Sequence, residues 1–320
     1  MREISYLEAI REALVEEMKK SELVFMLGED IAEYGGAFGV SKGLLQTFGA
    51  QRIRNTPMSE SAIVGVAAGA AITGMRPIVE IMFMDFITLA IDQLINHACQ
   101  YRYVSNGQIK VPMVIRTPAG GGRGYGATHS KSLEPLLLCI PGLKIVYPSN
   151  AYDAKGLLKS AILDDNPVVF IENKLLYAKK SSVPDEEYTV PLGKAKIVRE
   201  GKKATIITYS RMVQESMMAV EELGLDVEII DLRTLLPLDV KTITDSVCKT
   251  GRAIIVEESY KTGGIGAEVA AVLQEQCFGY LDAPILRVAA KDIPLPCTPI
   301  LEEEVLPGKK DIQDALRRII

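Results

Sequence analysis

Side chains that bind metal ions or form disulfides are scarce in this sequence of 320 residues. It contains two histidines, His97 and His129, and this number excludes a histidine-rich metal centre. Its five cysteines lie far apart, and no two of them form a C-x-x-C pair. An odd number of scattered cysteines argues against both a disulfide framework and a structural zinc site.

Long hydrophobic runs and an excess of positive charge are absent as well. The longest nearly apolar run, from Ala62 to Met75, is about a third shorter than a transmembrane span requires. The amino terminus contains no apolar segment of the signal-peptide type. The formal net charge is −5 and no basic stripe with interleaved aromatics is present, so nucleic acid is not an expected partner. We expect a cytoplasmic protein that binds neither membranes nor nucleic acid.

Helical and strand-like segments alternate along almost the whole chain. Ser5 and Glu8 form a capping-box pattern that predicts a helix to about Lys20, and an apolar strand follows it. Later segments repeat this order, including one long helix expected from Phe86 to Tyr103. The apolar strands do not alternate with polar residues, which is typical of parallel sheets covered by helices on both faces.

The alternation lapses once, between Lys174 and Lys203, where charged residues and prolines accumulate. It then resumes with the same strand and helix pattern to the end of the chain. We therefore predict two doubly wound α/β domains, residues 1–190 and residues 191–320.

Five of the 26 glycines lie in TPAGGGRGYGATHSKS, residues 117–132. A Walker-type phosphate loop requires G-x-x-x-x-G-K-[ST], which the chain lacks. Residues 122–127 fit the relaxed dinucleotide pattern, but several residues separate them from the preceding strand, and the next strand does not end in an acidic residue. These contexts argue against a phosphate site. A second cluster, residues 261–268, predicts a tight turn, with an anion site as the alternative.

Several single residues are candidates for a functional site. Glu60 falls in the first turn of an apolar helix. One interpretation is a carboxylate stabilised there by the helix dipole. The alternative is a buried carboxylate whose pKa is raised and which can share a proton with a ring nitrogen. His129 lies in a glycine-rich loop and is not a core residue. Glu29 follows a strand at the edge where open α/β sheets bind ligands, with a solvated loop carboxylate as the alternative. Phe86 and His97 are expected to pack in the structure.

A set of motifs spread over the whole chain resembles one family. In order they are MLGEDIAEYGGAFGVSKGL, NTPMSE, GMRPIVEIMFMDF, IDQLIN, VPMVIRTP, PGLKIVYPSNAYDAKGLLKSAI, DNPVVFIE, DLRTLLPLD and TGGIGAE. Together they resemble the beta subunit of the thiamine diphosphate-dependent dehydrogenase component of 2-oxo acid dehydrogenase complexes, a group that includes bacterial acetoin dehydrogenases. The resemblance implies a transketolase-like pyrimidine-binding domain followed by a transketolase C-terminal-type domain.

The resemblance also implies a cofactor and partners. Thiamine diphosphate is expected across the interface with an alpha subunit in an α2β2 heterotetramer. Enzymes of this group hold Mg²⁺ and the diphosphate through a GDG motif, which this chain lacks, so the alpha subunit is expected to supply it. The further implied partners are a lipoyl-bearing dihydrolipoamide acyltransferase core and a small substrate, either a 2-oxo acid or acetoin.

Site residues follow from the same resemblance. Glu60 matches the glutamate that bonds to the aminopyrimidine nitrogen, Phe86 an aromatic that packs on this ring, and Met58 a residue whose backbone borders it. His129 matches a histidine near the reacting centre, acting as acid or base or orienting the substrate and the lipoyl group. Glu29 matches an acidic residue proposed for proton relay. Backbone oxygens that bind potassium in the family match Met113, Ala161, Ile162, Asp164 and Asn166.

Three positions depart from the family pattern. Thr128 and Lys131 replace two glutamines beside the histidine, and Cys139 replaces a second histidine in many relatives. The expected function is oxidative decarboxylation of pyruvate or a branched-chain 2-oxo acid, or oxidative cleavage of acetoin, with acyl transfer to lipoamide. The alternatives are the carboxyl half of a split transketolase and a noncatalytic assembly subunit.

Overall fold

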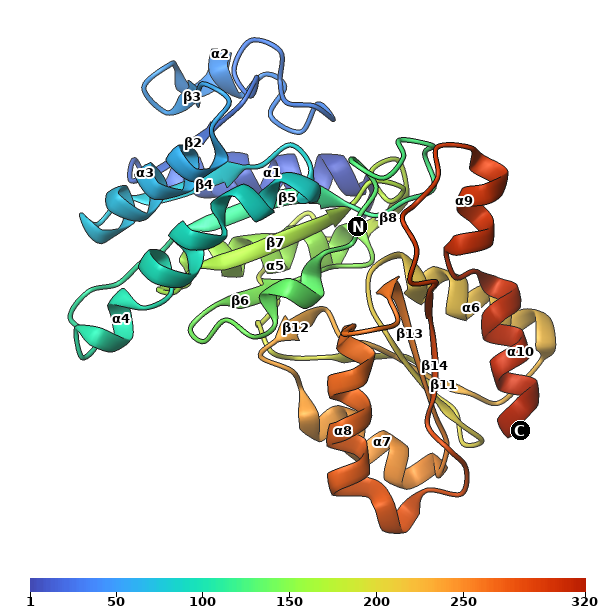
Figure 1. The fold of residues 1–320 in the computed structure, drawn as a ribbon. Helices are drawn as coiled ribbons and strands as arrows, with labels where there is room; N and C mark the ends of the chain where they lie inside the picture. The colour runs from blue at the N-terminus through green and yellow to red at the C-terminus, as the bar shows by residue number, and fades with distance from the viewer. The chain divides into compact units, whose positions relative to one another are not determined.

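The computed structural model describes residues 1–320, whose contacts divide the chain into two units (Figure 1). The first unit comprises Met1–Ala119 and Cys139–Leu192. The second comprises Gly120–Leu138 and Gly193–Ile320. The glycine-rich loop therefore packs with the second half of the chain, although it lies within the span predicted for the first domain.

A parallel sheet forms the centre of the first unit. Its strands lie in the order β6-β7-β5-β4-β2-β3, and every neighbouring pair is parallel. Their bounds are β2 (Val24–Gly28), β3 (Ile53–Asn55), β4 (Arg76–Glu80), β5 (Val114–Ala119), β6 (Lys144–Val146) and β7 (Val168–Asn173). A separate antiparallel pair consists of β1 (Arg2–Ser5) and β8 (Lys180–Val183). The predicted parallel sheet is confirmed.

Helices cover both faces of this sheet. The helices α1 (Tyr6–Lys20) and α5 (Ala151–Leu163) pack against each other, and Val24 and Met26 of β2 share one core cluster with them. The predicted capping box of α1 is confirmed, since Ser5 and Glu8 hydrogen bond reciprocally. Phe25 and Leu27 point to the opposite face because strand residues alternate. There they line a cavity of about 870 Å³ together with α3 (Glu60–Ile72).

The long helix predicted from Phe86 to Tyr103 is wrong. The segment forms three short pieces, a 3-10 helix η1 (Met84–Ala90), a π-helix η2 (Gln93–Ala98) and α4 (Tyr101–Val104). Apolar periodicity identified a helical segment but did not distinguish the i→i+3 and i→i+5 hydrogen bonds from an α-helix. Short helices also include α2 (Leu44–Phe48).

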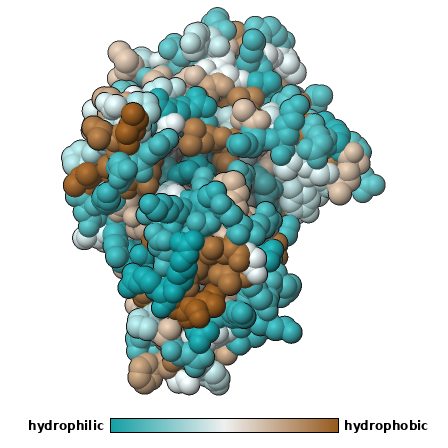
Figure 2. Space-filling model, turned by 90° about the vertical axis from the view of Figure 1, so that its right-hand side faces the viewer, coloured by the Kyte–Doolittle hydropathy of each residue, from teal (hydrophilic) through white to brown (hydrophobic).

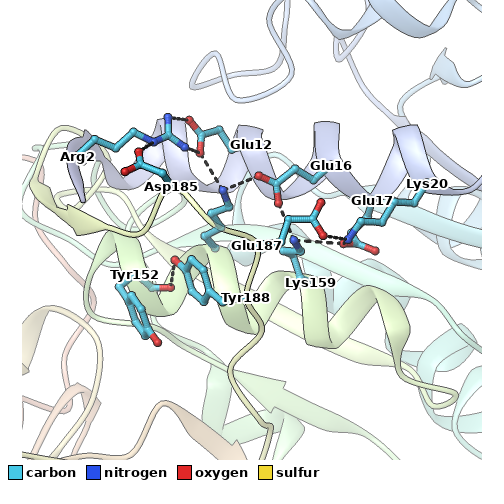
Figure 3. A network of polar contacts seen from close by, with 11 residues as sticks. Arg2, Glu12, Glu16, Glu17, Lys20, Tyr152, Lys159, Asp185, Glu187 and Tyr188 are labelled. Carbon is cyan, nitrogen blue, oxygen red and sulfur yellow. Dashed lines mark hydrogen bonds and ion pairs between the residues drawn. The ribbon is translucent and has the colours of Figure 1, made fainter.

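An ion network between α1 and α5 explains most of the motif DAKGLLKSAI (Figure 3). Lys155 and Lys159 are fully buried, and both contact Glu16 of α1, at 2.5 and 2.6 Å. A Cβ added at Gly156 would lie 2.9 Å from the Tyr188 ring, so a larger residue does not fit there. That ring stacks on Tyr152 with centroids 4.5 Å apart. The motif therefore serves packing: it fixes α5 to α1 and to the segment around Tyr188.

The second unit contains a second twisted sheet with strand order β14-β13-β10-β11-β9, parallel except for β9 at the edge. The strands of this unit are β9 (Lys196–Arg199), β10 (Thr205–Thr208), β11 (Glu228–Asp231), β12 (Thr234–Leu236), β13 (Ala253–Tyr260) and β14 (Leu286–Ala290). Its helices are η3 (Glu134–Leu137), α6 (Arg211–Leu223), α7 (Val240–Thr250), α8 (Ile265–Cys277), η4 (Phe278–Tyr280), α9 (Pro299–Val305) and α10 (Lys309–Ile319).

This sheet too is covered on both faces. Ile206 of β10 belongs to a core cluster with Met212 of α6 and Ile312 of α10. The neighbouring Thr205 points the other way and hydrogen bonds to Ser246 of α7 at 2.7 Å. The prediction of two doubly wound α/β units is confirmed.

The surface drawn in Figure 2 is mostly hydrophilic, with hydrophobic side chains gathered in several separate groups. Scattered exposed apolar residues are normal for folded proteins. None of the helices combines the length and the apolarity that a bilayer crossing requires.

Candidate active site

The carboxyl ends of β2 and β3 bring two predicted site segments together. Gly28 and Asn55 are paired in register at the ends of these parallel strands. The Thr56 N–H donates to the Gly28 carbonyl at 3.0 Å, and the Ala32 N–H donates to the Asn55 side chain at 2.8 Å. These bonds tie the loop after β2, which carries Glu29, to the segment that leads into α3.

Glu29 and Glu60 carry negative charge at this edge without compensation from the chain. Glu29 is 9% exposed, whereas Glu60, the first residue of α3, is half-buried. Neither carboxylate takes part in a hydrogen bond or an ion pair. Burial raises the pKa of Glu29 above its usual value, and the charges of Glu60 and Asp30 raise it further. Two carboxylates held in this way are a functional-site candidate, because structural carboxylates of this burial are normally paired.

A buried network supports the loop that carries Glu29. Arg116 of β5 donates to both oxygens of Glu172 at 2.7 and 2.9 Å and to Glu80 at 2.7 Å. The Tyr177 hydroxyl also donates to Glu172, at 2.7 Å. A Cβ at Gly36, where φ is +81°, would lie 2.6 Å from a Glu80 oxygen. The loop therefore packs directly on this network, and only glycine fits there.

Phe86 belongs to a chain of aromatic rings. Its ring lies 6.1 Å from Phe83, edge to face, and Phe83 lies 5.5 Å from Phe38. Phe38 in turn lies 5.3 Å from Tyr177 of the buried network. Phe86 itself is half-buried, so part of its ring is accessible. Met58, by contrast, is 86% exposed. The site assignments of both residues stay predictions.

His129 belongs to the second unit, in the loop Gly120–Leu138. Its backbone N–H donates to the Gly126 carbonyl at 3.3 Å. Its Nδ1 lies 2.9 Å from the hydroxyl of Thr128, one of the residues that depart from the family pattern. A hydroxyl can donate to this nitrogen or accept from it, so the contact orients the imidazole ring in either tautomer. The departure at Thr128 therefore concerns the candidate acid–base group directly.

The glycine-loop amides that could have bound a phosphate have protein partners. The Gly121 N–H donates to Glu258 and the Gly124 N–H to Glu302, both at 2.8 Å. Both carboxylates are almost completely buried. A phosphate at these amides would have to displace two negative charges, which gives a physical reason why this glycine-rich stretch is not a phosphate loop.

The positions expected to bind potassium surround the carboxyl end of α5: Met113, Ala161, Ile162, Asp164 and Asn166. Arg76 supplies positive charge there, since its Nη1 donates to the carbonyl oxygens of Ile162 and Asp164 at 2.8 and 3.2 Å. Arg102 donates to the Asn166 side chain at 2.9 Å. A cation is favourable at a helix carboxyl end. Potassium at these positions stays a prediction.

Three carboxylates in or beside the histidine loop could not be recognised from the sequence pattern. These are Glu134 within the loop, Glu258 at the end of β13 and Glu302 in α9. Glu134 is fully buried, accepts a hydrogen bond from Tyr209 at 2.7 Å, and has its pKa raised by burial to about 7. Glu302 lies among other glutamates in LEEEV, and no pattern distinguishes the buried one from its exposed neighbours.

Comparison with known proteins gives a consistent result over both units. The family described as "Transketolase, pyrimidine binding domain" matches residues 2–180, and "Transketolase, C-terminal domain" matches residues 193–312. A pyruvate dehydrogenase E1 component subunit beta of Gracilaria tenuistipitata var. liui is 49% identical over the whole of both chains. The chain belongs to the beta subunits of thiamine diphosphate-dependent 2-oxo acid dehydrogenases.

One further relative supports this family and one solved structure supports the fold. The pyruvate dehydrogenase E1 component subunit beta of Rhizobium meliloti (strain 1021) is 47% identical over 98% of this chain and 69% of its own length. A solved structure titled "Split gene transketolase, inactive beta4 tetramer" superimposes with a TM-score of 0.82, covering 99% of this chain and 98% of its own, at 24% identity. At this identity the solved structure shows the fold alone.

The carboxylate pair of this beta subunit fits thiamine diphosphate. The aminopyrimidine half of the cofactor carries an amine that donates N–H groups and a ring nitrogen that can share a proton with a carboxyl group, and Glu29 and Glu60 have no partner from the chain. Phe86 offers a ring face for stacking. The residues present therefore match the chemistry of the pyrimidine half, in agreement with the family model that covers them.

Proposed function

We propose that this beta subunit, together with an alpha subunit, catalyses the oxidative decarboxylation of pyruvate with acyl transfer to lipoamide. The observation that carries the proposal is the Glu29–Glu60 pair, two uncompensated carboxylates at the carboxyl edge of the pyrimidine-binding unit. Pyruvate is favoured over branched-chain 2-oxo acids and acetoin because the relatives above are named pyruvate dehydrogenase subunits.

The chain contributes acceptors, a ring face and an acid–base group. Glu60 would hold the aminopyrimidine nitrogen through a shared proton, with Phe86 packed on the ring and the Met58 backbone at its border. Thiamine diphosphate, when bound, supplies the carbon nucleophile and holds the electrons released by decarboxylation. His129 would move a proton at the substrate, and Glu29 would exchange protons with Glu60.

The missing half of the cofactor site is assigned to the partner. Because the chain has no GDG motif, Mg²⁺ and the diphosphate would be held by an alpha subunit in an α2β2 heterotetramer. A lipoyl-bearing acyltransferase core would accept the acyl group. We further propose that potassium binds at the carboxyl end of α5 and that the boundary between the two domains lies near residue 190.

Reconstitution tests the proposal directly. The chain alone, and the chain with its alpha partner, are assayed with thiamine diphosphate, an artificial electron acceptor, and pyruvate, a branched-chain 2-oxo acid or acetoin. We expect activity only in the assembled enzyme, with pyruvate used fastest. Glu60→Gln should lower kcat by about 100-fold or more, since it removes a proton-transfer group. The exposed Glu186→Gln is the control and should leave kcat unchanged.

Three results would contradict the proposal in different ways. Activity of the purified chain alone would remove the need for a partner. Ketol transfer between sugars without a lipoyl protein would support a split transketolase. Unchanged turnover of the assembled Glu60→Gln enzyme would support a noncatalytic assembly subunit.

A further inference from the structure

The loop that carries His129 lies in a cradle built by two distant parts of the second unit. One side is the end of β13 with Glu258, and the other is the segment from Cys297 to Leu306 that contains α9. The two amide–carboxylate hydrogen bonds, from Gly121 and Gly124, fix the loop backbone on these two sides. Each joins residues more than a hundred positions apart, so the sequence alone does not reveal the cradle.

The glycines of the loop are matched to the shape of this cradle. A Cβ at Gly121 would lie 2.7 Å from Leu306 Cδ1. A Cβ at Gly124 would lie 2.9 Å from the Cys297 carbonyl, and one at Gly126 would touch its sulfur. Three glycines therefore let the loop backbone approach the carboxyl-terminal segment more closely than any other residue would. This accounts for the glycine cluster without a phosphate.

The carboxylate of Glu302 is costly for stability. Its side chain is 1% exposed, and one oxygen accepts from Gly124 while the other is buried without a hydrogen-bond partner. A buried carboxylate with an unpaired oxygen destabilises a fold relative to an apolar side chain of the same size. Features that oppose stability are concentrated at functional sites. Glu258 is better compensated, because Arg211 donates to it at 2.9 Å.

We propose that Glu302 is a positioning residue: its bond to the Gly124 amide, together with the packing of Leu306 on Gly121, holds the loop in the conformation that presents His129. The effect on catalysis rests on the proposed role of His129, whereas the attachment of the loop to Glu302 and Leu306 does not depend on that role. Glu258 holds the opposite side of the same loop. The segment from Cys297 to Leu306 thus belongs functionally to the histidine loop.

Two measurements on matched variants test the proposal. Glu302→Met keeps the size of the side chain and removes the acceptor, Glu302→Gln keeps an acceptor oxygen, and the exposed Glu303→Met is the control. Hydrogen exchange of residues 120–132 is measured in the full chain, and kcat and KM are measured in the enzyme assembled with its partner. Loss of a hydrogen bond to a charged group changes an equilibrium constant, here that of loop opening, by about tenfold or more.

We expect Glu302→Met to speed exchange at residues 120–132 by about tenfold and to lower kcat by a similar factor with a smaller change in KM. Glu302→Gln should restore most of the slow exchange and most of kcat, and Glu303→Met should match the unmodified chain in both measurements. Unchanged exchange in a folded Glu302→Met chain would overturn the positioning role. Faster exchange with unchanged kcat would keep the cradle and reject the proposed catalytic role of His129.

A second pair of variants covers the case in which Glu302→Met does not fold. Gly121→Ala places a methyl group against Leu306, at a position without left-handed backbone. It should speed exchange of the loop, and the additional change Leu306→Ala should slow it again by making room. If the double variant exchanges as fast as Gly121→Ala alone, the packing half of the proposal is wrong.

Discussion

Two pairs of carboxylates, one in each unit of this chain, differ in the partners that the chain gives them. In the first unit, Glu29 and Glu60 lie close enough to repel each other, and no group of the chain neutralises them. In the second unit, Glu258 and Glu302 accept hydrogen bonds from backbone amides of the glycine-rich loop. The first pair is arranged to receive a donor from outside, whereas each carboxylate of the second pair already accepts a hydrogen bond from the loop backbone.

The difference indicates that the first pair serves to bind a ligand, whereas the second pair serves to position a loop. A carboxylate without partners costs stability, and the cost is recovered only when a ligand supplies the missing donors. A carboxylate bonded to a loop amide adds rigidity and leaves little capacity for a ligand. The two kinds of carboxylate should therefore respond differently to the same substitution by glutamine.

The largest response is expected at Glu134, the buried carboxylate inside the histidine loop. Burial, with a smaller contribution from the charges of Glu257 and Glu258, raises its pKa to about 7, although the hydrogen bond from the Tyr209 hydroxyl lowers it. A raised pKa means that the folded state keeps a proton which the unfolded state releases at about pH 4.5. This contribution to stability is complete below pH 4.5 and is lost as the pH rises to about 7.

Glu134→Gln keeps an acceptor for Tyr209 and removes the ionisation. At pH 8 we expect the variant to be more stable than the unmodified chain by about 2 kcal/mol, and its stability to vary less between pH 5 and pH 7. Thermal unfolding followed by calorimetry over this pH range measures the effect. Parallel pH profiles for the two proteins would show that Glu134 ionises normally in the fold.

A smaller gain of about 1 kcal/mol is expected from Glu29→Gln at pH 7.5, since the change removes a buried charge that is repelled by Glu60 and Asp30. The same variant should lose activity in the assembled enzyme, because stability and function conflict at such sites. The control is Glu186→Gln, an exposed carboxylate that takes no part in the repulsion at Glu29. A Glu29→Gln chain that is less stable than the unmodified one would mean that the pair has a stabilising partner after all.

The smallest effect is expected at Thr128, whose hydroxyl contacts Nδ1 of His129. Thr128→Val keeps the shape and removes this hydrogen bond, so kcat should fall by about two- to tenfold. Thr128→Ser retains the hydroxyl and should recover most of the rate. Steady-state kinetics of the assembled enzyme provide the comparison, and equal rates for valine and serine would show that the hydroxyl does not orient the ring.

Local patterns were sufficient to predict most of the fold. The capping box at Ser5 and the residues Ala151 to Leu163 gave helices at the expected positions, because caps and apolar periodicity act within a few residues. The prediction for the segment from Phe86 to Tyr103 was wrong in its type of helix, because apolar periodicity does not distinguish 3-10 and π geometry from an α-helix. The antiparallel pair of β1 and β8 was missed because its strands are far apart in sequence.

The candidate site could be predicted only in part. Glu29 and Glu60 could be proposed from the sequence because both lie at strand ends or helix starts, and parallel strands bring these ends to one edge; their roles stay predictions. Glu258 and Glu302 were missed, since their meaning depends on contacts with a loop more than a hundred residues away. The glycines at 121, 124 and 126 were correctly noticed, but the surface that requires them lies near Leu306.

The cradle also has a consequence for the order of events during synthesis. Glu302 follows Gly124 by 178 positions, so the loop leaves the ribosome about 10 to 40 s before the segment that holds it. Within that interval the sheet of the first unit can form once β7 has been synthesised, while the histidine loop has only one side of its support or none. The histidine loop can therefore be seated only after α9 has been synthesised, and chains interrupted between Leu192 and α9 contain a complete first unit and an unseated loop.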